Sequence, residues 1–294
     1  MIDWQKITGD KRLKFLIGLM VVVVLLVIFS LDLIISIYSF RKNISFETEE
    51  VEEYIAREEV PAPATKEAKE IKKRKAKIAI ILDDAGSDLS NYAAIFSIKQ
   101  PLTIGIIPCL PTSFKIAERA RKAGIQVILH LPMEPKNSRY SRNYGGMINC
   151  ASNDNEIKKL VLEDFSSVKL AVGFNNHMGS KATEDERVMK AVFSSIDPKM
   201  FFVDSRTSRN SIALKYAKNH NIRSGENNIF LDGTTKESEI EDRFRTLVTM
   251  ARYRGYAIGI GHATRRATIS VLSRLMPEYS KNGIKFVHAS ELVK

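Results

Sequence analysis

From residue 77 onward, the chain alternates short, β-branched apolar runs with longer stretches of helical periodicity. The helical stretches include 113–123 and 237–253, where apolar residues recur at spacings of three and four. This alternation predicts parallel strands joined by crossover helices, and so many units in one domain favour a barrel, closed or incomplete, over an open sheet. The predicted strands are 77–83, 103–107, 126–131, 169–174, 200–204, 256–260 and 284–287.

A much longer apolar run lies near the N-terminus. From Phe15 to Leu31 no residue is charged, and the apolar character continues after Asp32 as far as Phe40. A helix needs about 20 mostly apolar residues to span a bilayer, so we expect residues 15–40 to form a transmembrane anchor. A cleaved signal peptide is the alternative, but no small-x-small cleavage site follows the run.

The charges around this run predict an orientation. Four cations lie in residues 1–14, and only Arg41 and Lys42 follow the run closely. The positive-inside rule therefore predicts a cytoplasmic arm at residues 1–14 and a C-terminal region outside the cytoplasmic membrane. Residues 41–76 are rich in Glu, Lys and Arg around a Pro-Ala-Pro-Ala stretch, and they predict a charged, flexible stalk.

Residues 77–294 are long enough for one α/β domain with a sizeable core. From Lys72 onward there are 36 Lys and Arg against 22 Asp and Glu, a net charge of 36 − 22 = +14. This charge predicts an anionic glycan or lipid headgroups as partners, whereas nucleic acid is not expected because no nucleic-acid motif is present.

The sequence contains two cysteines, Cys109 and Cys150. So few cysteines exclude a disulfide framework and a cysteine zinc cluster, but one disulfide bond between the two remains possible.

Polar residues cluster where the predicted strands end. Because functional residues of parallel α/β domains gather at the carboxyl ends of the strands, these side chains are candidates for one site. Carboxylates and imidazoles together predict a divalent metal, with zinc the best match, although an Asp pair at a strand end can instead cap the next helix. The candidates are Asp83, Asp84, His130, Glu134, Asn175, Asn176, His177, Asp204, Ser205, Arg206 and His262.

Several of these residues belong to longer motifs. Together the motifs resemble the divergent polysaccharide deacetylase family of bacterial envelopes, a branch of the carbohydrate esterase family 4 fold. The resemblance extends from Lys77 to the C-terminus. Its segments are Ile80–Gly86, His130–Pro135, Gly173–Ser180, Phe202–Thr207, Phe230–Asp232 and Ala257–His262.

The resemblance implies a distorted (β/α) barrel that removes N-acetyl groups from amino sugars of an envelope glycan. Such a protein would act on the periplasmic or extracytoplasmic side of the bacterial cytoplasmic membrane. The first Asp of the family's pair acts as base and the second binds metal, which assigns these roles to Asp83 and Asp84. His130 corresponds to a metal ligand, and His262 corresponds to the general acid.

The second motif departs from the family pattern. The family has two histidines four residues apart before a proline, whereas this chain has His130 and then Glu134 before Pro135. We expect His177 to be the third metal ligand, with Glu134 as the alternative, since another carboxylate would add negative charge beside the Asp pair. The resemblance further implies that Asn176, Asp204 and Arg206 orient the substrate or the catalytic groups.

Three functions remain open from the sequence. The first is a metal-dependent deacetylase of envelope glycan, which the retained base Asp83 favours. The second is a glycan-binding or scaffold protein that keeps the fold without the reaction, which the altered second motif favours. The third is hydrolysis of another amide or ester at the same site.

Overall fold

The computed structural model describes residues 15, 18–27, 30–31, 74–87, 92–137 and 146–294. The chain divides into two units, 1–47 and 48–294. In the first unit, residues 18–27 are helical. No helix in the described part of the chain combines the length and apolar character needed to cross a membrane. Half of the predicted anchor and nearly all of the predicted stalk lie outside the described residues.

The second unit is built on one sheet of nine strands whose pairs are all parallel. Along the sheet the strand order is β6-β5-β4-β3-β2-β1-β8-β7, and β9 pairs with the first residues of β1. The strands are β1 (Ala76–Ala85), β2 (Thr103–Ile106), β3 (Gln126–Met133), β4 (Gly173–Met178), β5 (Phe201–Asp204), β6 (Arg223–Glu226), β7 (Ile229–Phe230), β8 (Tyr256–His262) and β9 (Ile284–Val287).

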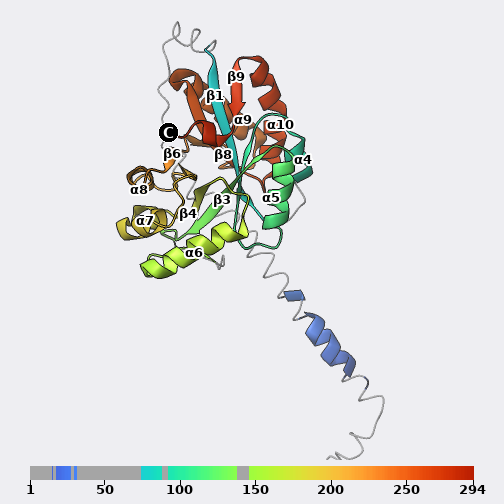
Figure 1. Cartoon of the computed structure of the whole chain (residues 1–294). Coiled ribbons are helices and arrows are strands. Elements are labelled where there is room, and N and C mark those ends of the chain that lie inside the picture. The colour runs from blue at the N-terminus through green and yellow to red at the C-terminus, as the bar shows by residue number, and fades with distance from the viewer. Residues whose placement is uncertain (1–14, 16–17, 28–29, 32–73, 88–91, 138–145) are drawn as a thin grey trace, which may run out of the picture. The chain divides into compact units, whose positions relative to one another are not determined.

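Helices connect the strands and lie around the outside of the sheet (Figure 1). Local sequence signals mark several of their ends. Helix α6 starts with a capping box between Asn153 and Glu156, and α9 ends at Gly255, whose φ of 88° suits glycine. The helices are α4 (Tyr92–Ser97), α5 (Ser113–Lys122), α6 (Asp154–Ser167), α7 (Glu186–Phe193), α8 (Ala213–Asn219), α9 (Glu237–Arg254) and α10 (Arg266–Lys281), with short 3₁₀ turns at Ala182–Glu184 and Ala289–Glu291.

The predicted parallel α/β architecture is confirmed, and the barrel is incomplete. Strands β6 and β7 form the two ends of the sheet, and no pairing joins them among the described residues. The predicted fourth strand, 169–174, is wrong at its start, because β4 begins only at Gly173 and runs through the polar residues to Met178. Strands β6 and β7 were not predicted, since they are short and β6 is polar.

Side chains on alternate positions of each strand pack on opposite faces of the sheet. Ile78, Ile80 and Leu82 join the large cluster that includes helix residues, whereas Ala79 and Ile81 join a second cluster inside the half-barrel. The interior cluster also contains Ile128 of β3, Phe201 and Val203 of β5, Phe230 of β7, and Ile258 and Ile260 of β8. The same alternation decides which polar residues at the strand ends point inward.

The two cysteines are not bonded to each other. Cys109 is an exposed free thiol and Cys150 is a half-buried one. Burial and the neighbouring Glu134 carboxylate raise the pKa of Cys150 to about 11. At neutral pH this thiol is therefore protonated and a poor nucleophile.

One buried carboxyl outside the barrel interior makes folding sensitive to pH. Asp164 of α6 is 1% exposed, and neither of its carboxyl oxygens has a hydrogen-bond partner among the residues that the structure describes. Burial, with a contribution from Glu163, raises its pKa from 3.8 to about 8. Because the folded state holds this proton more tightly than the unfolded state, stability falls as pH rises from about 4 to about 8.

We expect Asp164→Asn to increase the free energy of unfolding at pH 9 by about 1–3 kcal/mol, because it removes a buried charge without a partner. At pH 5, where Asp164 is already protonated, the variant and the parent should differ much less. Urea unfolding at both pH values measures the effect. Asp242→Asn, at an exposed position of α9, is the control. Equal changes at pH 5 and pH 9 would contradict the assignment.

Candidate metal centre

The candidate site lies at the carboxyl ends of the strands, and its first element is a turn in β1. The alternation that places Ala79 and Ile81 inside also places Asp83 inside and would direct Asp84 outward. The backbone changes direction here: Asp84 has φ 61°, and the β1–β2 register shifts between Leu82 and Ala85. This bulge allows two adjacent carboxylates to serve one site.

Asp84, His130 and His177 form the candidate metal site. The Oδ1 atom of Asp84 lies 3.2 Å from Nε2 of His130 and 3.1 Å from Nδ1 of His177, and the two nitrogens are 3.1 Å apart. Strands β1, β3 and β4 each contribute one of the three side chains. Among the described residues, these three have ligand atoms close enough to share one ion.

The spacing of these atoms fits a small divalent ion. Around a four-coordinate zinc with bonds of about 2.0–2.1 Å, neighbouring ligand atoms are roughly 3.3 Å apart. The three measured separations are only slightly shorter than that. Burial acts to raise the pKa of Asp84, but its close contacts with the imidazoles of His130 and His177 hold this pKa well below its usual range. Asp84 is therefore an anionic ligand at neutral pH.

Asn175 links Asp83 to His130. Its Nδ2 donates to both carboxylate oxygens of Asp83, at 3.0 and 2.8 Å, so its Oδ1 is left to accept from Nδ1 of His130 at 2.8 Å. This contact places the His130 proton on Nδ1 and leaves Nε2 free to bind metal. The Asp83 carboxylate also packs against Gly105 of β2, where an added Cβ would lie only 2.1 Å from Oδ1.

His262 of β8 faces the cluster from the other side. Its Nε2 lies 3.8 Å from Oδ2 of Asp84, and its Nδ1 donates to Oδ1 of Asp232 at 2.7 Å. Asp232 is fully buried and also accepts from the His262 backbone N–H at 2.7 Å and from the Thr268 hydroxyl at 2.5 Å. These contacts fix the position and the tautomer of the His262 ring.

The pKa shifts of His262 and Asp83 make the first a proton donor and the second a proton acceptor. Burial acts to lower the pKa of His262, but the Asp232 carboxylate outweighs it and raises the pKa to about 9. His262 therefore carries a proton at neutral pH. Burial raises the pKa of Asp83 above its usual value, against the opposing effects of His130 and Asn175. A carboxylate with a raised pKa is a stronger base than a free one.

Four predicted residues have contacts outside this cluster. Asn176 lies on the face of β4 opposite to Asn175 and His177, and it bonds to Met178, Thr207 and Ser205. Asp204 accepts from Ser211 and the Arg206 backbone, and Arg206 pairs with Glu226. Glu134 accepts from Lys181 at 2.6 Å and from the Cys150 backbone. The geometry therefore places His177, and not Glu134, beside Asp84 and His130.

Two residues that orient the histidines were not predicted for these roles. Asn175 was a strand-end candidate without a role, and Asp232 stood only in a motif of the family resemblance. The alternation within each strand is the signal that finds both: Asn175 shares its face of β4 with His177, and Asp232 follows Phe230 of the interior cluster by two residues. The carboxylate that holds a histidine is thus Asp232, whereas Asp204 has other partners.

Comparison with known proteins identifies the family of the chain. Residues 80–293 match the divergent polysaccharide deacetylase family. An uncharacterized protein of Haemophilus influenzae is 36% identical over 211 residues, which cover 69% of this chain and 72% of that protein. The uncharacterized protein YibQ of Escherichia coli K12 is 29% identical over 218 residues, which cover 74% of this chain and 67% of that protein.

A solved structure shares the fold. The crystal structure of an uncharacterized protein from Agrobacterium tumefaciens C58 superimposes with a TM-score of 0.69 at 20% identity, and the match covers 83% of this chain and 95% of that one. With the family match spanning nearly the whole sheet and every residue of the cluster, the chain belongs to the divergent polysaccharide deacetylase family.

Proposed function

We propose that this protein is a metal-dependent hydrolase that removes N-acetyl groups from an amino-sugar polysaccharide. The observation that carries the proposal is the triangle of half-buried Asp84 and buried His130 and His177, flanked by a carboxylate and by a protonated imidazole. Family membership supports a glycan as the substrate. A site with ligands alone would need neither Asp83 nor the His262–Asp232 pair.

The three ligand residues suit zinc, which binds imidazole and carboxylate in sites with an open position. When bound, a divalent metal supplies a Lewis acid that polarises the acetyl carbonyl and lowers the pKa of water towards about 7. Asp84 contributes the negative charge that holds such an ion. His130 contributes Nε2 in a tautomer set by Asn175.

The flanking residues perform the proton transfers. Asp83 accepts the proton of the attacking water, and its pKa, raised by burial, suits it to that role. His262 donates its proton to the amide nitrogen as the C–N bond breaks, which yields acetate and a free amine. Asp232 keeps His262 protonated and oriented between turnovers.

The proposal includes a place in the cell. The uncharged run from Phe15 to Leu31 and the cations before it support a single membrane anchor at residues 15–40. In this arrangement the deacetylase domain works on the outer side of the bacterial cytoplasmic membrane. The net charge of the region from Lys72 onward would favour binding to an anionic envelope glycan.

Acetate release tests the proposed reaction. The purified full-length chain, loaded with zinc, is expected to release acetate from chitin oligosaccharides or from peptidoglycan fragments, and chelation with a metal-binding agent should stop the release. Re-adding zinc should restore it. Failure to release acetate from any N-acetylated glycan, with zinc bound at one ion per chain, would reject the reaction.

A glycan-binding protein without turnover is the second candidate. It is favoured by one observation: the histidine expected after His130 is replaced by Glu134, which pairs with Lys181. If the protein is such a binder, it should bind the same glycans without releasing acetate. Asp83→Asn should then leave the affinity for these glycans unchanged.

A further inference from the structure

The amino ends of the strands form a face of the second unit on the opposite side of the sheet from the metal centre. We call this face the amino edge. It carries exposed cations, among them Lys77 of β1, Arg223 of β6, Lys285 of β9 and the C-terminal Lys294. At about 3.3 Å per residue, Lys77 and Asp84 are about 23 Å apart along β1, so the amino edge is separate from the metal centre.

Lysines of adjacent strands lie side by side on this edge. Lys77 pairs in register with Lys285 of β9 on one side and with Tyr256 of β8 on the other. Neighbouring strands are about 4.8 Å apart, so the structure holds two exposed ammonium groups close together. Like charges at facing positions of a sheet are destabilising, and an anion bound between them would relieve the repulsion.

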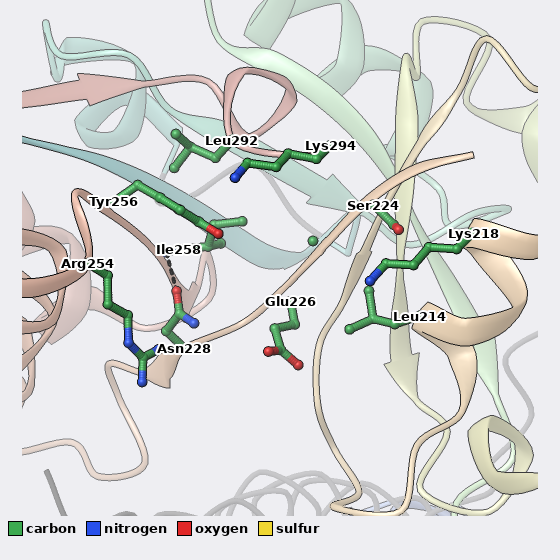
Figure 2. A pocket seen from close by; sticks show the side chains of 11 residues that line it. Leu214, Lys218, Ser224, Glu226, Asn228, Arg254, Tyr256, Ile258, Leu292 and Lys294 are labelled. Carbon is green, nitrogen blue, oxygen red and sulfur yellow. Dashed lines mark hydrogen bonds between the residues drawn. The ribbon is translucent and has the colours of Figure 1, made fainter. Parts of the chain in front are cut away.

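The C-terminus and the end of α9 add cations beside these strands. Figure 2 shows Arg254, Tyr256 and Lys294 around one pocket between β6 and β8, and Nζ of Lys294 lies 5.4 Å from the centre of the Tyr256 ring. The backbones of Ser224 and Lys294 bond to each other in both directions, at 2.8 and 3.2 Å. These bonds fix the C-terminal residue on the amino edge.

The cations of the amino edge differ from those near the metal centre in their partners. Near the centre, Lys181 pairs with Glu134 at 2.6 Å. Lys136 pairs with Glu184 at 2.7 Å. In the described part of the chain, no carboxylate pairs with any of the amino-edge cations named above. Their charge is therefore available to an anion outside the protein.

The charge continues around the edge. The loops that lead from helices into strands carry further exposed lysines, which are Lys99 before β2, Lys169 before β4 and Lys199 before β5. Carboxylates are fewer, and the exposed ones on this edge include Asp197, Glu278 and Glu291. The cations come from many separate segments, so they form a broad surface, which suits a charged plane better than a single small anion.

Helix dipoles explain only part of this pattern. Cations in the last turn of a helix are favourable because they complement its dipole. That reason applies to Lys122 of α5, Arg254 of α9 and Lys281 of α10. It does not apply to Lys77 and Lys285, which lie on strands.

Apolar side chains are exposed among these cations. Val172 lies directly before β4, Tyr253 lies in the last turn of α9, and Tyr256 begins β8. Their exposed fractions are 48%, 66% and 38%. Tyrosine side chains at the headgroup level are typical of surfaces that meet a bilayer, where the ring lies in the apolar boundary and the hydroxyl in water. Cations together with exposed tyrosines therefore favour a lipid surface over a soluble polyanion.

We propose that the amino edge docks on anionic phospholipid headgroups of the membrane that carries the chain. This inference rests on the anchor in the proposed function, and it adds which face of the domain meets the membrane. The chain enters the domain on this edge, because β1 begins at Ala76 directly after the Lys-Lys-Arg-Lys sequence of residues 72–75. Lipid phosphates pair with the lysines of the edge, and the metal centre faces away from the bilayer.

Lysine labelling of the full-length chain in vesicles tests the docking. A water-soluble acetylating ester modifies exposed lysines, and mass spectrometry gives the rate at each one. In vesicles that contain phosphatidylglycerol, Lys77, Lys285 and Lys294 should react at least about threefold more slowly than in pure phosphatidylcholine, and high salt should abolish the difference. Lys115 and Lys215, exposed lysines in the first turns of α5 and α8, are the controls and should react equally in both.

Variants show whether the charges of the edge cause the protection. Lys285→Gln combined with Lys294→Gln should remove most of the protection of Lys77, because fewer cations then hold the face on the lipid. Lys115→Gln combined with Lys215→Gln removes the same charge from the opposite side of the domain and should leave Lys77 protected. All of these positions lie outside the metal centre, so the result does not depend on turnover.

The anchor and the docking fail in different ways. A chain without an anchor will not float with phosphatidylcholine vesicles, but the amino edge should still bring it to vesicles that contain phosphatidylglycerol. No flotation with either vesicle overturns the docking. If the chain floats with both, equal labelling of Lys77 in the two overturns it. Protection of Lys77 by soluble polygalacturonate and not by phosphatidylglycerol would assign the edge to a glycan and also overturn it.

Discussion

Asp84→Asn is expected to leave the protein folded but unable to hold its metal. The Asp84 carboxylate is the only anionic member of the three-residue ligand set, and its Oδ1 is within 3.2 Å of both imidazole nitrogens. A neutral amide is a much poorer ligand and removes the charge that attracts the ion. Since loss of a residue that merely supports a ligand weakens metal binding about 10–100-fold, loss of a ligand should weaken it by at least about 100-fold.

Metal content by elemental analysis and zinc affinity by competition with a chelator measure this result. His177→Ala should lose affinity to a similar degree, whereas Glu134→Gln should retain the metal, because Glu134 pairs with Lys181 and not with the cluster. Full metal retention in His177→Ala together with loss in Glu134→Gln would reassign the third ligand. Full retention in Asp84→Asn would remove the proposed centre altogether.

Asp83→Asn should keep the metal and lose turnover. Asp83 lies on the Nδ1 side of His130, with its Oδ1 3.7 Å from that nitrogen, whereas Asp84 lies on the Nε2 side. If Asp83 accepts the proton from water, an amide at this position cannot, and kcat should fall by about 10²–10⁴-fold. The expected signature is therefore a low kcat with zinc still bound at one ion per chain.

The metal content of the same variant separates catalysis from positioning. Asp83 contacts Asn175, which orients His130, so a purely orienting Asp83 would show itself as a 10–100-fold loss of zinc affinity. In that case, adding excess zinc would restore turnover. Full activity of Asp83→Asn on a confirmed substrate would contradict both roles.

The sequence predicted the architecture because apolar burial follows a simple period. Strands that are buried on both faces appear in the sequence as short apolar runs. Six of the seven predicted strands match observed strands, and their ends agree to within two residues. The fourth prediction failed because its apolar residues at 170–172 lie in the connection after α6, and the strand itself carries Asn175, Asn176 and His177. Polar residues that face a barrel interior break the apolar signal on which such predictions rely.

The meeting of the candidate site residues was also predictable, since parallel strands bring their carboxyl ends to one edge. Asp84, His130, His177 and His262 all meet there. The orienting residues were less certain, because the strand ends offered Asn175 beside Asn176 and did not include Asp232. Counting alternate positions from the residues that face the barrel interior selects Asn175 and Asp232.

The sequence by itself therefore determined the strand–helix alternation, the barrel-like α/β class and the set of residues available to bind metal. Only the tertiary structure decided which of them meet. Asp84 reaches the site through a bulge with a positive φ, and His177, not Glu134, lies beside Asp84 and His130. Each of these depends on contacts between segments far apart in the chain, which no local pattern of residues encodes.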